Sequence, residues 1–206
     1  MATGNVWSRW ECGGTVRDDA ELTRIFLSLA LVANVVLVSA IVLGMQIGDV
    51  TRTDRAVQSA IGVHMLAGLG ALTFATLVHA IVLTYFMGTG RWLEETSRAY
   101  QLDLRLYQQS QKIKYGTLPG MIVCLLLLIG TGALGAAADP ATPVSLDGVL
   151  GLKGSTIHLL VALITIFVNL VVSLSQYLAV SGNAAIIEVV LGDVRRIRLE
   201  RGLPVN

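Results

Sequence analysis

The sequence predicts an all-α, polytopic membrane protein with four transmembrane helices in an up-down bundle. Of its 206 residues, 54% are hydrophobic and only 14% are charged, whereas a soluble domain carries about 25% charged residues. The mean hydropathy is +0.69. Four apolar runs, at about 25–47, 59–87, 118–138 and 155–181, are each long enough to cross ~30 Å of hydrocarbon. We therefore expect one transmembrane domain that occupies residues 1–206.

The segments between and after the spans predict additional helices. A polar N-terminal tail precedes the first span, so we expect that span to be an uncleaved anchor. Gly88 and Gly90 are expected to end the second helix, and Pro119 to begin the third. Residues 91–115 predict a cytoplasmic helix or helix pair, which either rests on the bundle and bilayer or offers a docking face. Residues 183–201 predict a basic amphipathic helix on the inner membrane surface.

The distribution of lysine and arginine predicts the orientation in the lipid bilayer. Three lie in the N-terminal tail, five between spans two and three, and four in the C-terminal tail, twelve together. The opposite side has three, Arg52, Arg55 and Lys153. Because cytoplasmic loops carry the excess of positive charge, both termini are expected in the cytoplasm, most simply at a bacterial inner membrane. A net charge of +1 gives no signal for nucleic acid, and Cys12 and Cys124 lack the CxxCH spacing of covalent haem.

Two histidines on different spans are expected at the same membrane depth. His64 lies nine residues outward of the centre of span two, about 13 Å, and His158 lies ten residues outward of the centre of span four, about 15 Å. His79 lies fifteen residues further along span two. At ~100° per residue, Gly68, Ala71 and Ala75 lie between the two histidines of that span, on the same face. A helix or a flat group can approach such a face closely.

Span four carries a polar stripe along its whole length. The stripe lies within about 20° of one line and consists of His158, Thr165, Asn169, Gln176 and Asn183. Polar side chains within hydrocarbon face the interior of a bundle. We therefore expect span four to turn this stripe, and His158 with it, toward the other helices.

A histidine pair on two helices that lie diagonally across a bundle can ligate one iron from opposite sides. This layout resembles the four-helix core of membrane b-type cytochromes, in which haem lies between the second and fourth helices and histidines recur about two haem layers apart. The resemblance implies one outer haem b on His64 and His158, with Gly68 beside it. It does not extend to an inner haem, because the level opposite His79 has no histidine. Arg52, Arg55 and Lys153 are the expected partners of haem propionates.

Three roles are candidates for His79. It binds a quinone together with Tyr177 or Gln176, it relays protons, or it makes a structural hydrogen bond to Asn169 or Gln176. The predicted function is electron transfer through one haem in a larger complex, with other membrane or peripheral redox subunits as partners. A cofactor-free scaffold subunit and a small proton- or solute-conducting subunit are the alternatives, and a homo-oligomer remains open.

Overall fold

The computed structural model describes residues 16–48, 54–139 and 141–204, and within these ranges it is helical without a strand. Its four long helices are α1 (Val16–Met45), α2 (Arg55–Tyr100), α3 (Arg105–Ala137) and α4 (Gly154–Glu200). A short 3-10 turn, η2 (Val149–Gly151), precedes α4. Each long helix contains a segment that is long and apolar enough to cross a membrane.

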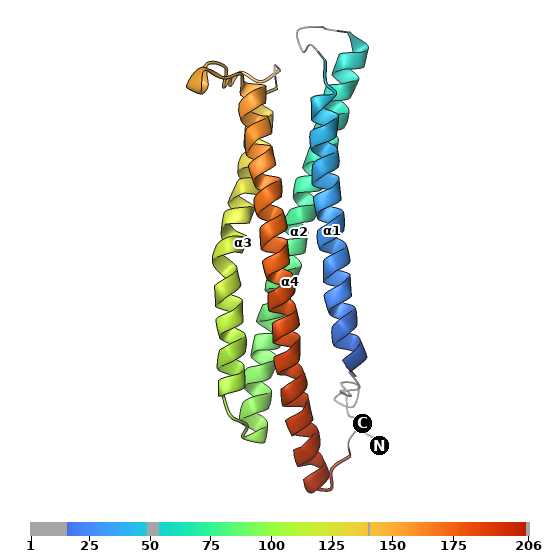
Figure 1. Cartoon of the computed structure of the whole chain (residues 1–206), viewed down its shortest axis with the longest axis vertical. Coiled ribbons are helices and arrows are strands. Elements are labelled where there is room, and N and C mark those ends of the chain that lie inside the picture. Colours follow the sequence, from blue (N-terminus) through green and yellow to red (C-terminus); the bar gives the residue numbers. More distant parts are fainter. Residues whose placement is uncertain (1–15, 49–53, 140, 205–206) are drawn as a thin grey trace, which may run out of the picture.

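The helices form a bundle in which the chain reverses direction at each connection (Figure 1). Helix α1 packs on α2, α2 on α3, α3 on α4, and α4 on α1. Helices α2 and α4 therefore stand diagonally, and they also contact each other across the core. This is the arrangement that brings His64 and His158 onto two inward-facing helices.

Helix α2 does not end at Gly88 and Gly90, so that expectation was wrong. It continues to Tyr100, and the chain turns only at Gln101, which has a left-handed backbone with φ of 56°. Glycine inside a helix costs only about 1 kcal/mol relative to alanine. Gly90 also makes room for a neighbour, because a Cβ there would lie 2.7 Å from Nε2 of Gln111 on α3. Gly90 therefore allows α2 to pack against α3 and does not terminate α2.

Helices α3 and α4 are likewise longer than their apolar spans. Pro119 does not begin a helix but lies inside α3, where its ring removes one backbone donor. The carbonyl that loses its helical donor is that of Tyr115, four residues earlier, and α3 nevertheless continues through the proline. Residues 183–200 are helical as the continuation of α4, which runs without a break to Glu200.

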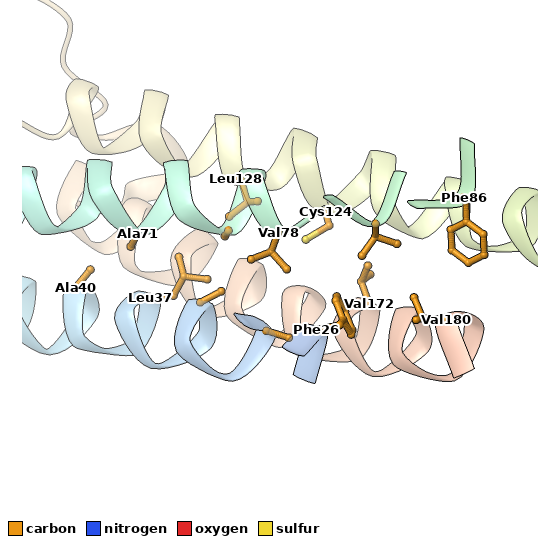
Figure 2. Packing of buried hydrophobic residues seen from close by; sticks show 14 residues of the cluster. Phe26, Leu37, Ala40, Ala71, Val78, Phe86, Cys124, Leu128, Val172 and Val180 are labelled. Carbon is orange, nitrogen blue, oxygen red and sulfur yellow. The ribbon is translucent and has the colours of Figure 1, made fainter. Parts of the chain in front are cut away.

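Two clusters of buried side chains hold the bundle together. The larger one follows the centre of the bundle and includes many small side chains, such as Ala40 on α1 and Ala71 on α2 (Figure 2). The smaller one joins Leu93 to Ile186 and Val190 where α2, α3 and α4 extend beyond the apolar spans. Small residues allow the close helix approach that stabilises bundles in lipid, where no hydrophobic effect drives helices together.

The continuity of α2 predicts the effect of replacing Gly88. Gly88→Ala should raise the thermal stability, by up to about 1 kcal/mol, because alanine is the better helix former and its Cβ would have no atom within 4 Å. Gly88→Pro should cost about 3 kcal/mol or more, because it removes a helical hydrogen bond. Thermal unfolding in detergent followed by circular dichroism measures both. Destabilisation by alanine would instead mean that the helix ends at this glycine.

Candidate functional site

The imidazoles of His64 on α2 and His158 on α4 meet inside one end of the bundle. Their ring centroids are 6.1 Å apart and their planes cross at 72°. The two residues are 94 positions apart in the sequence. The expectation that the two histidines face each other at one level of the bundle is therefore confirmed, and their depth in a membrane stays a prediction.

A cavity of about 500 Å³ surrounds the histidine pair, and all four helices line it. Its volume lies within the range of about 300–1,000 Å³ that is common for small-molecule sites. Apart from the two imidazoles and two threonines, the lining is apolar. The small lining residues are Ala40, Gly68, Ala71, Gly132, Gly135, Ala136 and Ala162. Gly68 thus belongs to the cavity, as the helical face of span two predicted.

Hydrogen bonding determines which nitrogen of His64 is available. Its Nδ1 lies 2.9 Å from the backbone carbonyl oxygen of Ala40. A carbonyl can only accept, so Nδ1 donates its proton there and the neutral ring keeps its lone pair on Nε2. A hydrogen bond of this kind orients a histidine and raises its basicity as a metal ligand. Nδ1 of His158 is likewise buried and directed at the backbone of Thr131, although the contact falls short of full hydrogen-bond geometry.

Two imidazoles can complete the coordination of a metal ion whose other positions are already filled by a cofactor. Within residues 16–48, 54–139 and 141–204, no group of three or more His, Cys, Asp or Glu side chains is placed to bind a metal. Two imidazoles alone suit a haem iron, whose porphyrin fills the other positions. With metal–nitrogen distances of about 2 Å, two axial imidazole rings would have centroids roughly 6 Å apart. The observed separation of 6.1 Å matches this requirement.

Of the three cationic residues expected near this end of the bundle, the structure describes two, Arg55 and Lys153. Lys153 is the N-cap residue of α4, and Arg55 is the first residue of α2. Both side chains are exposed and neither lines the cavity. Arg52 lies outside the described residues. The two described cations therefore stand at the same end of the bundle as the histidine pair, beyond its rim.

His79 lies in a different environment, in the buried centre of the bundle, with 1% of its surface exposed. Its Nδ1 is 3.0 Å from Oε1 of Gln176, and its Nε2 is 3.1 Å from Oδ1 of Asn169. The thiol of Cys124 on α3 lies 3.3 Å from Nε2 and donates to Asn169 Oδ1 at 3.5 Å. The structural hydrogen bonds considered for His79 are therefore present.

This network reaches α1 and thereby sets the tautomer of His79. The amide nitrogen of Asn34 donates to the Ala30 carbonyl at 2.8 Å, so its Oδ1 accepts from Nδ2 of Asn169 at 3.1 Å. Asn169 consequently presents its oxygen to His79, and Nε2 of the neutral ring is the protonated nitrogen. Nδ1 then needs a donor. Gln176 supplies this donor if its carboxamide is turned by 180°, so that Nε2 instead of Oε1 lies against Nδ1 of His79. The same turn gives Nε2 of Gln176 a partner, which this buried atom otherwise lacks.

Both nitrogens of His79 are thus engaged within the bundle, and Tyr177 is not among their partners. The histidine therefore offers no free nitrogen to a quinone in this arrangement. Of the other members of the polar stripe on α4, Thr165 and Asn183 are buried and His158 is half-buried. Thr165 lies 2.7 Å from the Thr131 hydroxyl of α3, and Asn183 accepts from the Ser110 hydroxyl at 2.6 Å. The inward orientation predicted for the stripe is confirmed.

Sequence reasoning missed several partners of these side chains. Cys124, Thr131 and Ser110 all lie on α3, where they face α2 and α4. Together with Thr117, which is also buried, they recur every seven residues on one face of α3, which is the signal that could have identified them. Gly44 and Gly135, which lie against the two imidazoles, were missed as well. Comparison of the chain with protein-family models, curated proteins and solved structures gives no match.

The central network predicts a stability loss without a loss of the outer cavity. His79→Ala should cost about 1–2 kcal/mol, because Asn169, Gln176 and Cys124 lose their common partner in a buried site. Thermal unfolding in detergent measures the change. Thr84→Ala is the matched control, since this exposed threonine bonds only to its own helix. Equal stability of the two variants would contradict a stabilising role for His79.

Proposed function

We propose that the chain is an integral membrane electron-transfer subunit that binds one b-type haem between His64 and His158. The observation that carries the proposal is the pair of imidazoles at 6.1 Å inside an apolar cavity of about 500 Å³. A bound haem supplies one-electron oxidation and reduction of its iron. Among the residues that the structure describes there is no other candidate metal site, so the proposal requires donor and acceptor subunits as partners.

The residues of the site have separate tasks in this proposal. His64 presents the lone pair of Nε2, because the Ala40 carbonyl holds the proton of Nδ1. His158 presents its ring from the diagonal helix, at the same level. The apolar lining excludes water, and small residues such as Gly68 and Ala71 leave room for a flat macrocycle. Two axial histidines occupy both open coordination positions, which favours electron transfer over the binding of a small substrate.

The proposal extends to the membrane. The four apolar helices cross a bacterial inner membrane as an up-down bundle, with both termini in the cytoplasm and the histidine pair near the outer face. The distribution of positive charge supports this orientation. The hairpin between α2 and α3 and the end of α4 then lie on the cytoplasmic side. Arg55 and Lys153 lie on the outer side, where they can attract haem propionates.

A cofactor-free scaffold subunit is the second candidate, and the central network favours it. The hydrogen bonds around His79 join residues of all four helices without any bound group. A protein that only holds partners together needs such a network. The histidine pair distinguishes the two candidates, because Nε2 of both rings has no hydrogen-bond partner among the described residues while Nδ1 of each is directed at a backbone group, and a scaffold gains nothing from that arrangement.

The haem proposal predicts the spectrum of the purified protein. The reduced form should show the sharp alpha and beta bands of a six-coordinate haem. His64→Ala and His158→Ala should each abolish these bands, since the loss of one axial ligand opens a coordination site and weakens binding. His79→Ala should leave them nearly intact, because His79 lies about 22 Å further along α2.

These three variants also separate the candidates from one another. A colourless wild-type protein from cells with ample haem would support the scaffold. Loss of the bands in His79→Ala alone would mean that the haem lies in the centre of the bundle. Addition of imidazole to His64→Ala or His158→Ala should restore part of the low-spin spectrum, which a merely misfolded variant does not allow.

The proposed orientation predicts which loops react with a membrane-impermeant thiol reagent. In a chain with Cys12 replaced by serine, Ser145→Cys should be labelled from outside intact cells, and Gln108→Cys only after lysis. Both positions are exposed in the structure, and they lie at opposite ends of the bundle. The reverse labelling pattern would invert the proposed topology.

A further inference from the structure

Each imidazole of the histidine pair lies against a glycine of the neighbouring helix. A Cβ atom on Gly44 of α1 would lie 2.7 Å from Cε1 of His64 and 3.0 Å from its Nδ1. A Cβ atom on Gly135 of α3 would lie 3.0 Å from Cε1 of His158. Real Cβ atoms essentially never approach closer than 3.0 Å. The ring of His64 therefore occupies space that only glycine leaves free, and the ring of His158 would have to move by a few tenths of an ångström to admit a Cβ on Gly135.

The environment of the two rings repeats around the bundle. Gly44 follows Ala40 by one helical turn, and the Ala40 carbonyl accepts the Nδ1 proton of His64 at 2.9 Å. Gly135 follows Thr131 by the same four residues on α3, and both line the cavity. Thus one helical turn of α1 that ends in Gly44 packs against the imidazole of His64, and the corresponding turn of α3 that ends in Gly135 packs against the imidazole of His158.

We propose that Gly44 and Gly135 are positioning residues that set the direction of the two imidazoles for axial ligation. This inference rests on the proposed haem function. A methyl group at either position pushes the Cε1 edge of the ring away, and the adjacent Nε2 moves with that edge. At position 44 the shift also strains the hydrogen bond to Ala40. The two glycines thereby determine both the 6.1 Å separation and the 72° angle of the pair.

Other glycines of the same helices provide matched controls. A Cβ on Gly130 of α3 would meet no atom within 4 Å, although this residue lies only five positions from Gly135. Alanine has the higher helix propensity, so Gly130→Ala should be neutral or stabilising. Gly44→Ala and Gly135→Ala make the same chemical change where an imidazole stands in the way.

The first experiment uses the haem-loaded protein. Crossed imidazole planes keep two iron d orbitals close in energy, so the oxidised wild-type protein should give a strongly anisotropic low-spin electron paramagnetic resonance signal. Gly44→Ala and Gly135→Ala should move this signal toward a less anisotropic form, or convert part of it to high spin. Gly130→Ala should leave the signal unchanged. Unchanged signals in both test variants would overturn the positioning role.

The second experiment measures thermal stability without haem and combines each glycine with its histidine. Gly44→Ala should lower the melting temperature when His64 is present, and should leave it unchanged or raise it in a His64→Ala background. Gly135→Ala should behave likewise with His158→Ala. Additive effects would refute the contacts themselves. Non-additive effects of the glycine and histidine substitutions, in a protein that never binds haem, would refute the haem function. The two glycines would then only make room for the imidazoles in the packed bundle.

Discussion

The hydrogen-bonded network around His79 is the contact on which the alignment of the four helices depends. It joins Asn34 of α1, Cys124 of α3, and Asn169 and Gln176 of α4 to one imidazole of α2. Apolar helices in lipid slide past one another at little cost, because their side chains resemble the solvent. Directional hydrogen bonds between buried groups remove this freedom, since a shift by one residue would leave several polar atoms without partners.

The alignment set at His79 is transmitted along rigid helices to the histidine pair. On α2, His64 lies fifteen residues from His79. On α4, the level of His79 falls between Asn169 and Gln176, near Val172 and Ser173, which are fourteen and fifteen residues from His158. Equal distances along two helices that run in the same direction bring the outer imidazoles to one level. The central network and the outer cavity are therefore parts of one axial arrangement.

The sequence was sufficient for the features that depend on hydropathy and helical periodicity. The four apolar helices, the inward polar stripe of α4 and the meeting of His64 with His158 all follow from these regular patterns. Helix ends were not predictable in the same way. Gly88 and Gly90 were interpreted as the end of one helix and Pro119 as the start of the next, but α2 and α3 run through all three positions. At Gly90 the missing side chain makes room for Gln111 of α3. Local propensity gives way where packing on a neighbouring helix contributes more free energy.

The contacts that were missed depend on backbone proximity between helices, which no periodicity within one helix reveals. Gly44 is one small residue among many on α1, and only its approach to His64 distinguishes it. The histidines also differ in the partners of their nitrogens. His79 has partners for both, whereas each outer ring is directed at a backbone group through Nδ1 alone, that of Ala40 for His64 and that of Thr131 for His158. Polar atoms inside a bundle are normally satisfied, so the two Nε2 atoms without a hydrogen-bond partner among the described residues point to the outer pair as the place where a ligand belongs.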